Sequence, residues 1–128
     1  MRIEVLEILD AECREVRFRS ELGDAWGVWQ ADVVPREGPF DVEVDIPEEI
    51  STWLPGEGGA DRLDGDPSRR QAVTVRGTVQ TVDEGSVTSL RVGRDIVLIE
   101  MANETAPPQP GSTITFDTPE IHLYPYQL

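Results

Sequence analysis

The sequence predicts an all-β protein with mainly antiparallel strands, arranged as a small barrel or sandwich. The clearest sign lies between Ala72 and Met101, where three runs rich in β-branched residues follow one another. Residues 83–85 and 93–95 separate these runs, and both have the composition of turns. Eleven glycines and ten prolines in 128 residues provide many further turns. This composition suits short strands better than long helices.

The N-terminal half is expected to contribute four strands, at residues 2–9, 15–20, 25–34 and 40–46. The last of these has the most regular alternation of apolar and acidic side chains. Its apolar residues are Phe40, Val42, Val44 and Ile46, and its acidic residues are Asp41, Glu43 and Asp45. We therefore expect one buried face and one face with three carboxylates, about 7 Å apart from one to the next.

One short helix is expected near residues 47–54. Pro47 suits the first helical turn, the two glutamates after it suit the positive end of the helix dipole, and Pro55 would end the helix. Three apolar side chains would share one face, at the spacing i, i+3 and i+4. They are Ile50, Trp53 and Leu54.

Two loops and a final strand complete the expected fold. Residues 55–70 contain four glycines and two prolines and are predicted to form a mobile loop. A second loop, with three prolines, spans residues 102–111 and precedes a strand at 112–118. The tail after residue 119 alternates apolar and polar side chains, so we expect it to pair or pack. We interpret residues 1–128 as a single domain.

The charge is strongly acidic. Acidic residues number 25 against 11 basic ones, which gives a formal net charge of −14, and residues 1–64 carry 17 of those acids against six arginines. A field of this sign repels phosphate backbones and anionic membranes and attracts cationic proteins. We therefore expect no nucleic-acid or membrane partner, and a basic protein as the partner. The alternative is that the acidity serves solubility alone or reflects compositional bias.

The residues available for catalysis are few. The chain has no lysine, and Cys13 and His122 are its only cysteine and histidine. This excludes lysine chemistry and an intramolecular disulfide, and no G-x-S-x-G motif supports a nucleophilic serine. We predict a protein that is not an enzyme and needs no cofactor. A cytoplasmic location is the expectation, because neither a signal peptide nor a disulfide framework is visible.

Metal binding is not expected either. Asp61, Asp64 and Asp66 surround a glycine in a way that resembles a calcium loop. An EF-hand, however, needs a stricter register of acids and a distant glutamate, which this segment lacks.

Short motifs in the C-terminal part carry a family resemblance. They are residues 76–79 (RGTV), 92–93 (VG), 110–114 (PGSTI) and 121–123 (IHL). With these motifs, residues 75–128 resemble the transport-associated oligonucleotide/oligosaccharide-binding (TOBE) module and related OB-fold barrels. The resemblance covers less than half of the chain and implies a small OB-like barrel, without implying a ligand.

The candidate partner-binding residues lie in the acidic half. They are Trp26, Trp29, Asp41, Glu43 and Asp45. An exposed tryptophan at a rim is a common binding hot spot, and a row of carboxylates could dock arginines or lysines. The alternatives are that both tryptophans are buried and that the acids form an ordinary solvent-facing strand surface.

We therefore expect a non-enzymatic, acidic, cytoplasmic interaction protein. Its most concrete form is an immunity-type inhibitor that occupies the cationic cleft of a basic partner. Two alternatives stay open, a small-ligand or oligosaccharide-binding OB-like barrel and an accessory subunit of unknown function. The sequence does not determine the oligomeric state.

Overall fold

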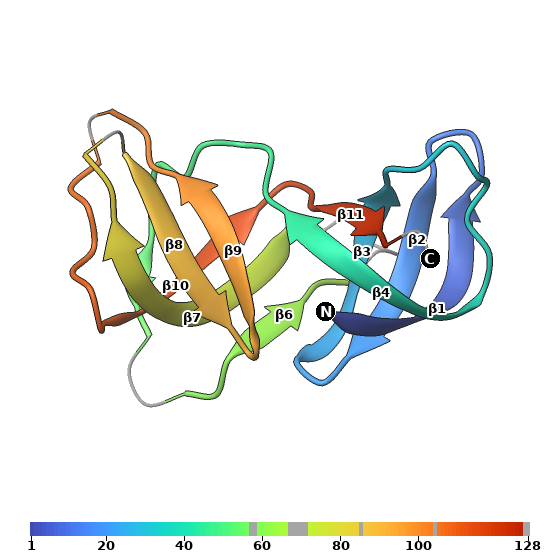
Figure 1. Cartoon of the computed structure of the whole chain (residues 1–128), viewed down its shortest axis with the longest axis horizontal. Coiled ribbons are helices and arrows are strands. Elements are labelled where there is room, and N and C mark those ends of the chain that lie inside the picture. The colour runs from blue at the N-terminus through green and yellow to red at the C-terminus, as the bar shows by residue number, and fades with distance from the viewer. Residues whose placement is uncertain (57–58, 67–71, 85, 104, 127–128) are drawn as a thin grey trace.

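The computed structural model describes all residues except 57–58, 67–71, 85, 104 and 127–128. The described residues form strands and connecting segments without a helix, which confirms the predicted all-β class. The strands build two sheets that lie side by side (Figure 1).

One sheet is a closed five-stranded barrel. Its strands follow the order β1-β2-β3-β11-β4, and β4 pairs with β1 to close it. All neighbours are antiparallel except β3 and β11, which are parallel. The strands are β1 (Arg2–Asp10), β2 (Glu15–Ser20), β3 (Gly23–Trp29), β4 (Gly38–Asp45) and β11 (His122–Pro125). The barrel thus combines the N-terminal third of the chain with a strand from the tail.

The second sheet is formed by the chain between β4 and β11. Its order is β5-β10-β7-β8-β9, and β6 pairs with β7 beside that path. The strands are β5 (Leu54–Pro55), β6 (Arg62–Asp64), β7 (Val73–Val82), β8 (Val87–Val92), β9 (Asp95–Glu100) and β10 (Thr113–Thr118). Strands β7, β8 and β9 are the predicted three-stranded meander, which is confirmed.

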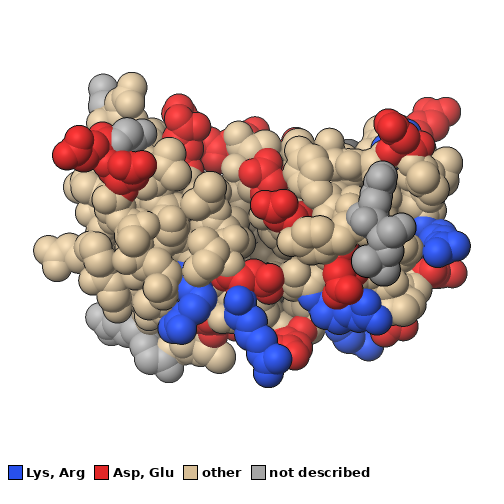
Figure 2. Space-filling view, in the orientation of Figure 1, with Lys and Arg blue, Asp and Glu red and all other residues tan. Residues whose placement is uncertain are grey.

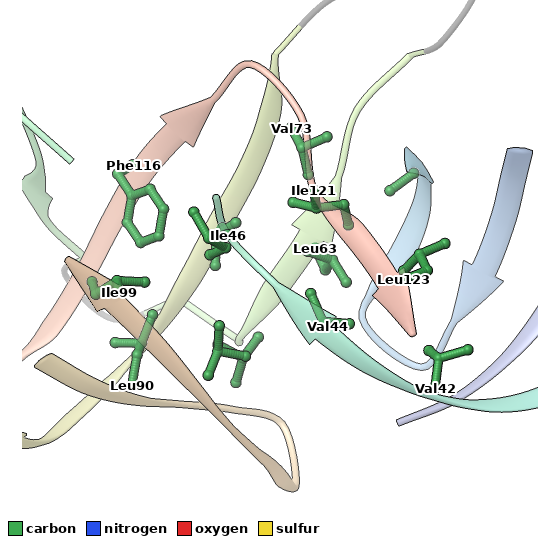
Figure 3. Packing of buried hydrophobic residues seen from close by; sticks show 14 of the residues in the cluster. Val42, Val44, Ile46, Leu63, Val73, Leu90, Ile99, Phe116, Ile121 and Leu123 are labelled. Atoms are coloured by element: carbon green, nitrogen blue, oxygen red, sulfur yellow. The ribbon is translucent and has the colours of Figure 1, made fainter. Parts of the chain in front are cut away.

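The two sheets share one hydrophobic core. Figure 3 shows buried side chains that run from the second sheet, through Ile46 and Leu63, to Val42 and Leu123 in the barrel. Strand β6 also joins the sheets by backbone hydrogen bonds. The amide of Leu63 donates to the carbonyl of Leu22 (3.3 Å), next to the barrel strand β3. The barrel is therefore supported on one side by the second sheet.

The predicted helix at residues 47–54 is wrong. The Ile50 amide donates to the Glu100 carbonyl (2.8 Å), and the Ala102 amide donates to the Ile50 carbonyl (3.0 Å). Ile50 is buried in this bridge, whereas Leu54 is 70% exposed in β5. A helix this short is marginal, so pairing with the ends of existing strands is the better way to satisfy these backbone groups.

Two other expectations need correction. The segment 55–70 contains strand β6, because Leu63, its one large aliphatic residue, is buried against β7; residues 57–58 and 67–70 lie outside the described residues. The strand expected at 25–34 ends at Trp29, and Val33 and Val34 are exposed in the connection to β4.

The strands of residues 75–128, the segment that resembles OB-fold barrels, are divided between the two sheets. In that segment only β11 belongs to the closed barrel, and the other strands belong to the second sheet.

Candidate functional site

The acidic strand surface lies where the sequence predicts it. Along β4, Val42 and Val44 are buried, Asp41 and Glu43 are exposed, and Asp45 is partly exposed. The carboxylates therefore project from the outer face of the barrel, because side chains alternate between the two faces of a strand.

Strand β11 places a ring beside each of these acids. In the antiparallel pairing of β11 with β4, His122 is opposite Asp45, and Tyr124 is opposite Glu43. The same ladder continues at Tyr126, whose amide donates to the Asp41 carbonyl (3.0 Å). We call this surface the acid–aromatic ladder. Its members are Asp41, Glu43, Asp45, His122, Tyr124 and Tyr126.

Each end of the ladder already has a contact with a side chain outside it. Arg2 Nη1 lies 3.2 Å from Asp41 Oδ2, and His122 Nε2 lies 3.4 Å from Glu120 Oε2. Glu43, in the middle of the ladder, and Asp45, opposite His122, have no ion pair with arginine among the described residues.

One acid on β1 and one on β3 are paired with arginines of β2. Arg19 Nε lies 2.8 Å from Asp24 Oδ1, and the hydrogen bond from this guanidinium lowers the pKa of Asp24. Arg17 Nε lies 3.9 Å from Glu7 Oε2. Glu4 of β1 and Glu15 of β2, like Glu43 and Asp45 of β4, have no ion pair among the described residues, so unpaired carboxylates on the barrel wall are not confined to β4.

The two candidate tryptophans are buried. Trp26 is 9% exposed and Trp29 is 3% exposed. Neither ring can therefore present itself as an exposed rim anchor, which was one of the two sequence-based interpretations. The other interpretation, burial, describes both residues.

Trp29 instead forms the floor of a groove at the end of the barrel. Its ring meets that of Phe40 edge to face, with centroids 5.0 Å apart and planes at 72°. The Arg36 guanidinium carbon lies 5.8 Å from the centroid of Phe40. The groove encloses about 570 Å³, a volume within the usual range for ligand sites. Its lining residues are Trp29, Ala31, Val33, Val34, Arg36, Phe40, Pro125 and Tyr126.

This barrel-mouth groove adjoins the acid–aromatic ladder. Tyr126 belongs to both surfaces, and Phe40 precedes Asp41 in β4. The groove was not predicted from the sequence, because its wall includes two valines, Val33 and Val34, that were expected to lie in a strand. Tyr124 and Tyr126 stand two residues apart and so share one face of a strand, which allows the same two interpretations as for the tryptophans, exposed binding residues or buried ones. Both are exposed, and the sequence pattern did not place them beside the acids of β4.

Two other surface features are less informative. A hollow of about 730 Å³ beside Trp53 has small or amide side chains and no charged residue in its described lining. On β9, Ile96 and Leu98 are exposed, and Figure 2 shows a broad surface without charge over β8 and β9. Nothing in the structure indicates what would cover either surface.

Two of the three aspartates in the segment that resembles a calcium loop, Asp61 and Asp64, contact groups of the protein itself. Asp61 Oδ2 accepts a hydrogen bond from the Gly93 amide (2.8 Å), and Asp64 Oδ2 lies 2.8 Å from Arg62 Nη2. Across the residues placed by the structure, no group of three or more histidines, cysteines or acids is arranged to hold a metal ion. In the same part of the chain, no helix has the length and hydrophobicity needed to cross a membrane.

Comparison with known proteins gives no relative. No family model, curated protein or solved structure matches the chain. The function is therefore inferred from the ladder and the groove alone.

Proposed function

We propose that this chain is a non-enzymatic interaction protein that binds a basic protein through the acid–aromatic ladder. One observation carries the proposal: Glu43 lies opposite Tyr124 in the pairing of β4 with β11, and neither Glu43 nor Asp45 has an ion pair with arginine among the described residues. A carboxylate next to an aromatic ring suits arginine and lysine, because it combines a charge-assisted hydrogen bond with a cation–π contact.

The chemistry of the whole chain supports a protein partner. A net charge of −14 would speed the approach of a cationic surface and disfavour phosphate-rich ligands. The ladder lies on a closed barrel, so little ordering is needed when the partner binds. An immunity-type inhibitor that covers the cationic cleft of a toxin is the concrete form of this function.

The test compares two double variants with equal net charge. Glu43→Gln/Asp45→Asn neutralises the ladder and leaves the Asp41–Arg2 pair in place. Glu84→Gln/Glu100→Gln removes two exposed acids outside the barrel, one between β7 and β8 and one at the end of β9, and serves as the matched control. The ligand is a basic protein captured from native lysate and then purified, with a fluorescein-labelled peptide of alternating arginine and serine as a defined probe.

The ladder variant should associate about fivefold more slowly at low salt and show a flatter dependence on ionic strength. The control should stay close to the unmodified protein. Equal effects of the two variants would show that only the overall charge matters and would refute the ladder as the binding surface.

A second candidate function is suggested by the groove. A closed five-stranded barrel with Trp29, Phe40 and Tyr126 around a groove also suits an OB-like module that binds a small ligand or an oligosaccharide. Titration with a panel of oligosaccharides, followed by tryptophan fluorescence, tests this alternative. An unchanged emission spectrum across the panel would count against it.

A further inference from the structure

The barrel-mouth groove extends the ladder into an apolar surface. We infer that it receives an aliphatic or aromatic side chain from the same basic segment whose cationic side chains contact the ladder; this inference rests on the proposed function. The partner would then be a basic segment with an apolar residue close to its cationic ones, and not simply a polycation.

Exposed apolar side chains are concentrated here. Seven large hydrophobic residues are exposed in the described part of the chain, and four of them lie at the groove or on the ladder. They are Val33 (69%), Val34 (65%), Tyr124 (42%) and Tyr126 (58%). Such a gathering of apolar surface with a polar border is typical of a protein-binding site.

The groove is held in shape by groups on both sides of it. The Trp29 amide donates to the Arg14 carbonyl (2.8 Å), and the Gln30 amide donates to the Leu123 carbonyl (2.9 Å). The buried Trp29 ring is packed edge to face against Phe40. The floor is therefore present before a partner arrives, as is usual for sites that take an apolar side chain.

The charges around the groove indicate which kind of peptide segment it can bind. Asp32 and Glu37 are exposed on the segment that forms the valine wall, and Asp41 and Glu43 follow on β4. Two arginines lie at this surface. Arg2 is paired with Asp41, whereas Arg36 lines the groove over Phe40 and has no ion pair among the described residues, so the acids at the border outnumber the cations. An apolar segment with cationic neighbours fits this border, whereas an acidic segment would be repelled.

The experiment uses the whole protein and three labelled peptides of equal length. One alternates arginine with leucine, one arginine with serine, and one glutamate with leucine. Binding is followed by fluorescence anisotropy to unmodified protein and to Val33→Ser/Val34→Ser, in which two exposed side chains change and the core is untouched. Ile96→Ser/Leu98→Ser on β9 is the control for general loss of exposed apolar surface.

The arginine–leucine peptide should bind about tenfold more tightly than the arginine–serine peptide, since burial of an aliphatic side chain is worth roughly that factor. The valine variant should lose this preference and keep its affinity for the arginine–serine peptide. The β9 control should keep both affinities. Methyl chemical shifts of Val33 and Val34 should move on binding, and those of Ile96 and Leu98 should not.

Each contrary outcome has a distinct meaning. Equal binding of the two arginine peptides overturns the groove inference and leaves the proposed ladder function intact. Binding of neither arginine peptide overturns both. Binding of the glutamate–leucine peptide as tight as that of the arginine–leucine peptide shows that the groove does not select for charge, which also overturns the inference.

Discussion

The packing of β11 against β3 gives the most quantitative prediction. Leu123 is fully buried, so Leu123→Ala loses three buried carbons and leaves a cavity, at a cost of about 3 kcal/mol in the free energy of unfolding. Gly27 faces it from the neighbouring strand. A methyl group at Gly27 would lie 3.0 Å from both Cγ and Cδ1 of Leu123 and 3.2 Å from Cγ1 of Ile121.

Gly27→Ala should therefore be destabilising, although alanine is otherwise favoured over glycine. Overpacking should lower the free energy of unfolding by about 2 kcal/mol, whereas the reduced conformational freedom of the unfolded chain should raise it by about 0.5–1 kcal/mol. The net loss is roughly 1 kcal/mol. In the double variant, Leu123→Ala removes the two atoms closest to the new methyl group. The double variant should then lose about 1.5 kcal/mol less than the sum of the single losses.

The assay is urea unfolding of the four proteins, followed by tryptophan fluorescence and analysed with a common m-value. Additive losses, within about 0.4 kcal/mol, would refute the direct packing of Leu123 on Gly27. Packing of β11 on β3 at this point would then have to be abandoned, and with it the position of the tyrosines beside β4.

Three further predictions concern single positions. The hydrogen bond to Asp10 raises the pKa of the exposed Cys13 thiol, so Asp10→Asn should speed its alkylation by iodoacetamide at mildly alkaline pH; an unchanged rate would contradict this. Asp24 has a lowered pKa through Arg19, so its stabilising effect is present at neutral pH and is lost as the pH falls through its folded pKa. Unfolding curves of the unmodified protein and Asp24→Asn should differ at pH 7 and converge in acid, and a constant difference would contradict the assignment. Gly77→Ala should cost about 3 kcal/mol or prevent folding, because the added methyl would overlap a backbone carbonyl of β8; near-native stability in urea would contradict that packing.

Local patterns predicted much of the fold. The strand at Glu15–Ser20 has the predicted boundaries, and β4 has the predicted buried and acidic faces. Both rest on alternation within a few residues, which directly reports the two faces of a strand. The meander of β7, β8 and β9 was predictable for the same reason, because its turns are short and its strands are consecutive in the chain.

Pairing between distant segments was not predictable from such patterns. Ile50 is extended because Met101 and its neighbours offer backbone partners, and nothing within residues 47–54 reveals them. In β6, Leu63 alone marks a strand within a segment rich in glycine and aspartate. The candidate site was predicted in part. The carboxylates of β4 followed from alternation, whereas the rings of Tyr124 and Tyr126 join them only through the long-range pairing of β11.

The position of β11 in the chain has a consequence for synthesis. Strand β11 follows every other strand in the sequence, yet it lies between β3 and β4 in the barrel. On the ribosome, the edges of β3 and β4 that bind β11 therefore stay unpaired until residues 122–125 emerge, after every other strand of both sheets. Unpaired edges are where nascent chains associate wrongly, so the barrel is open to mispairing until its last strand is inserted between β3 and β4.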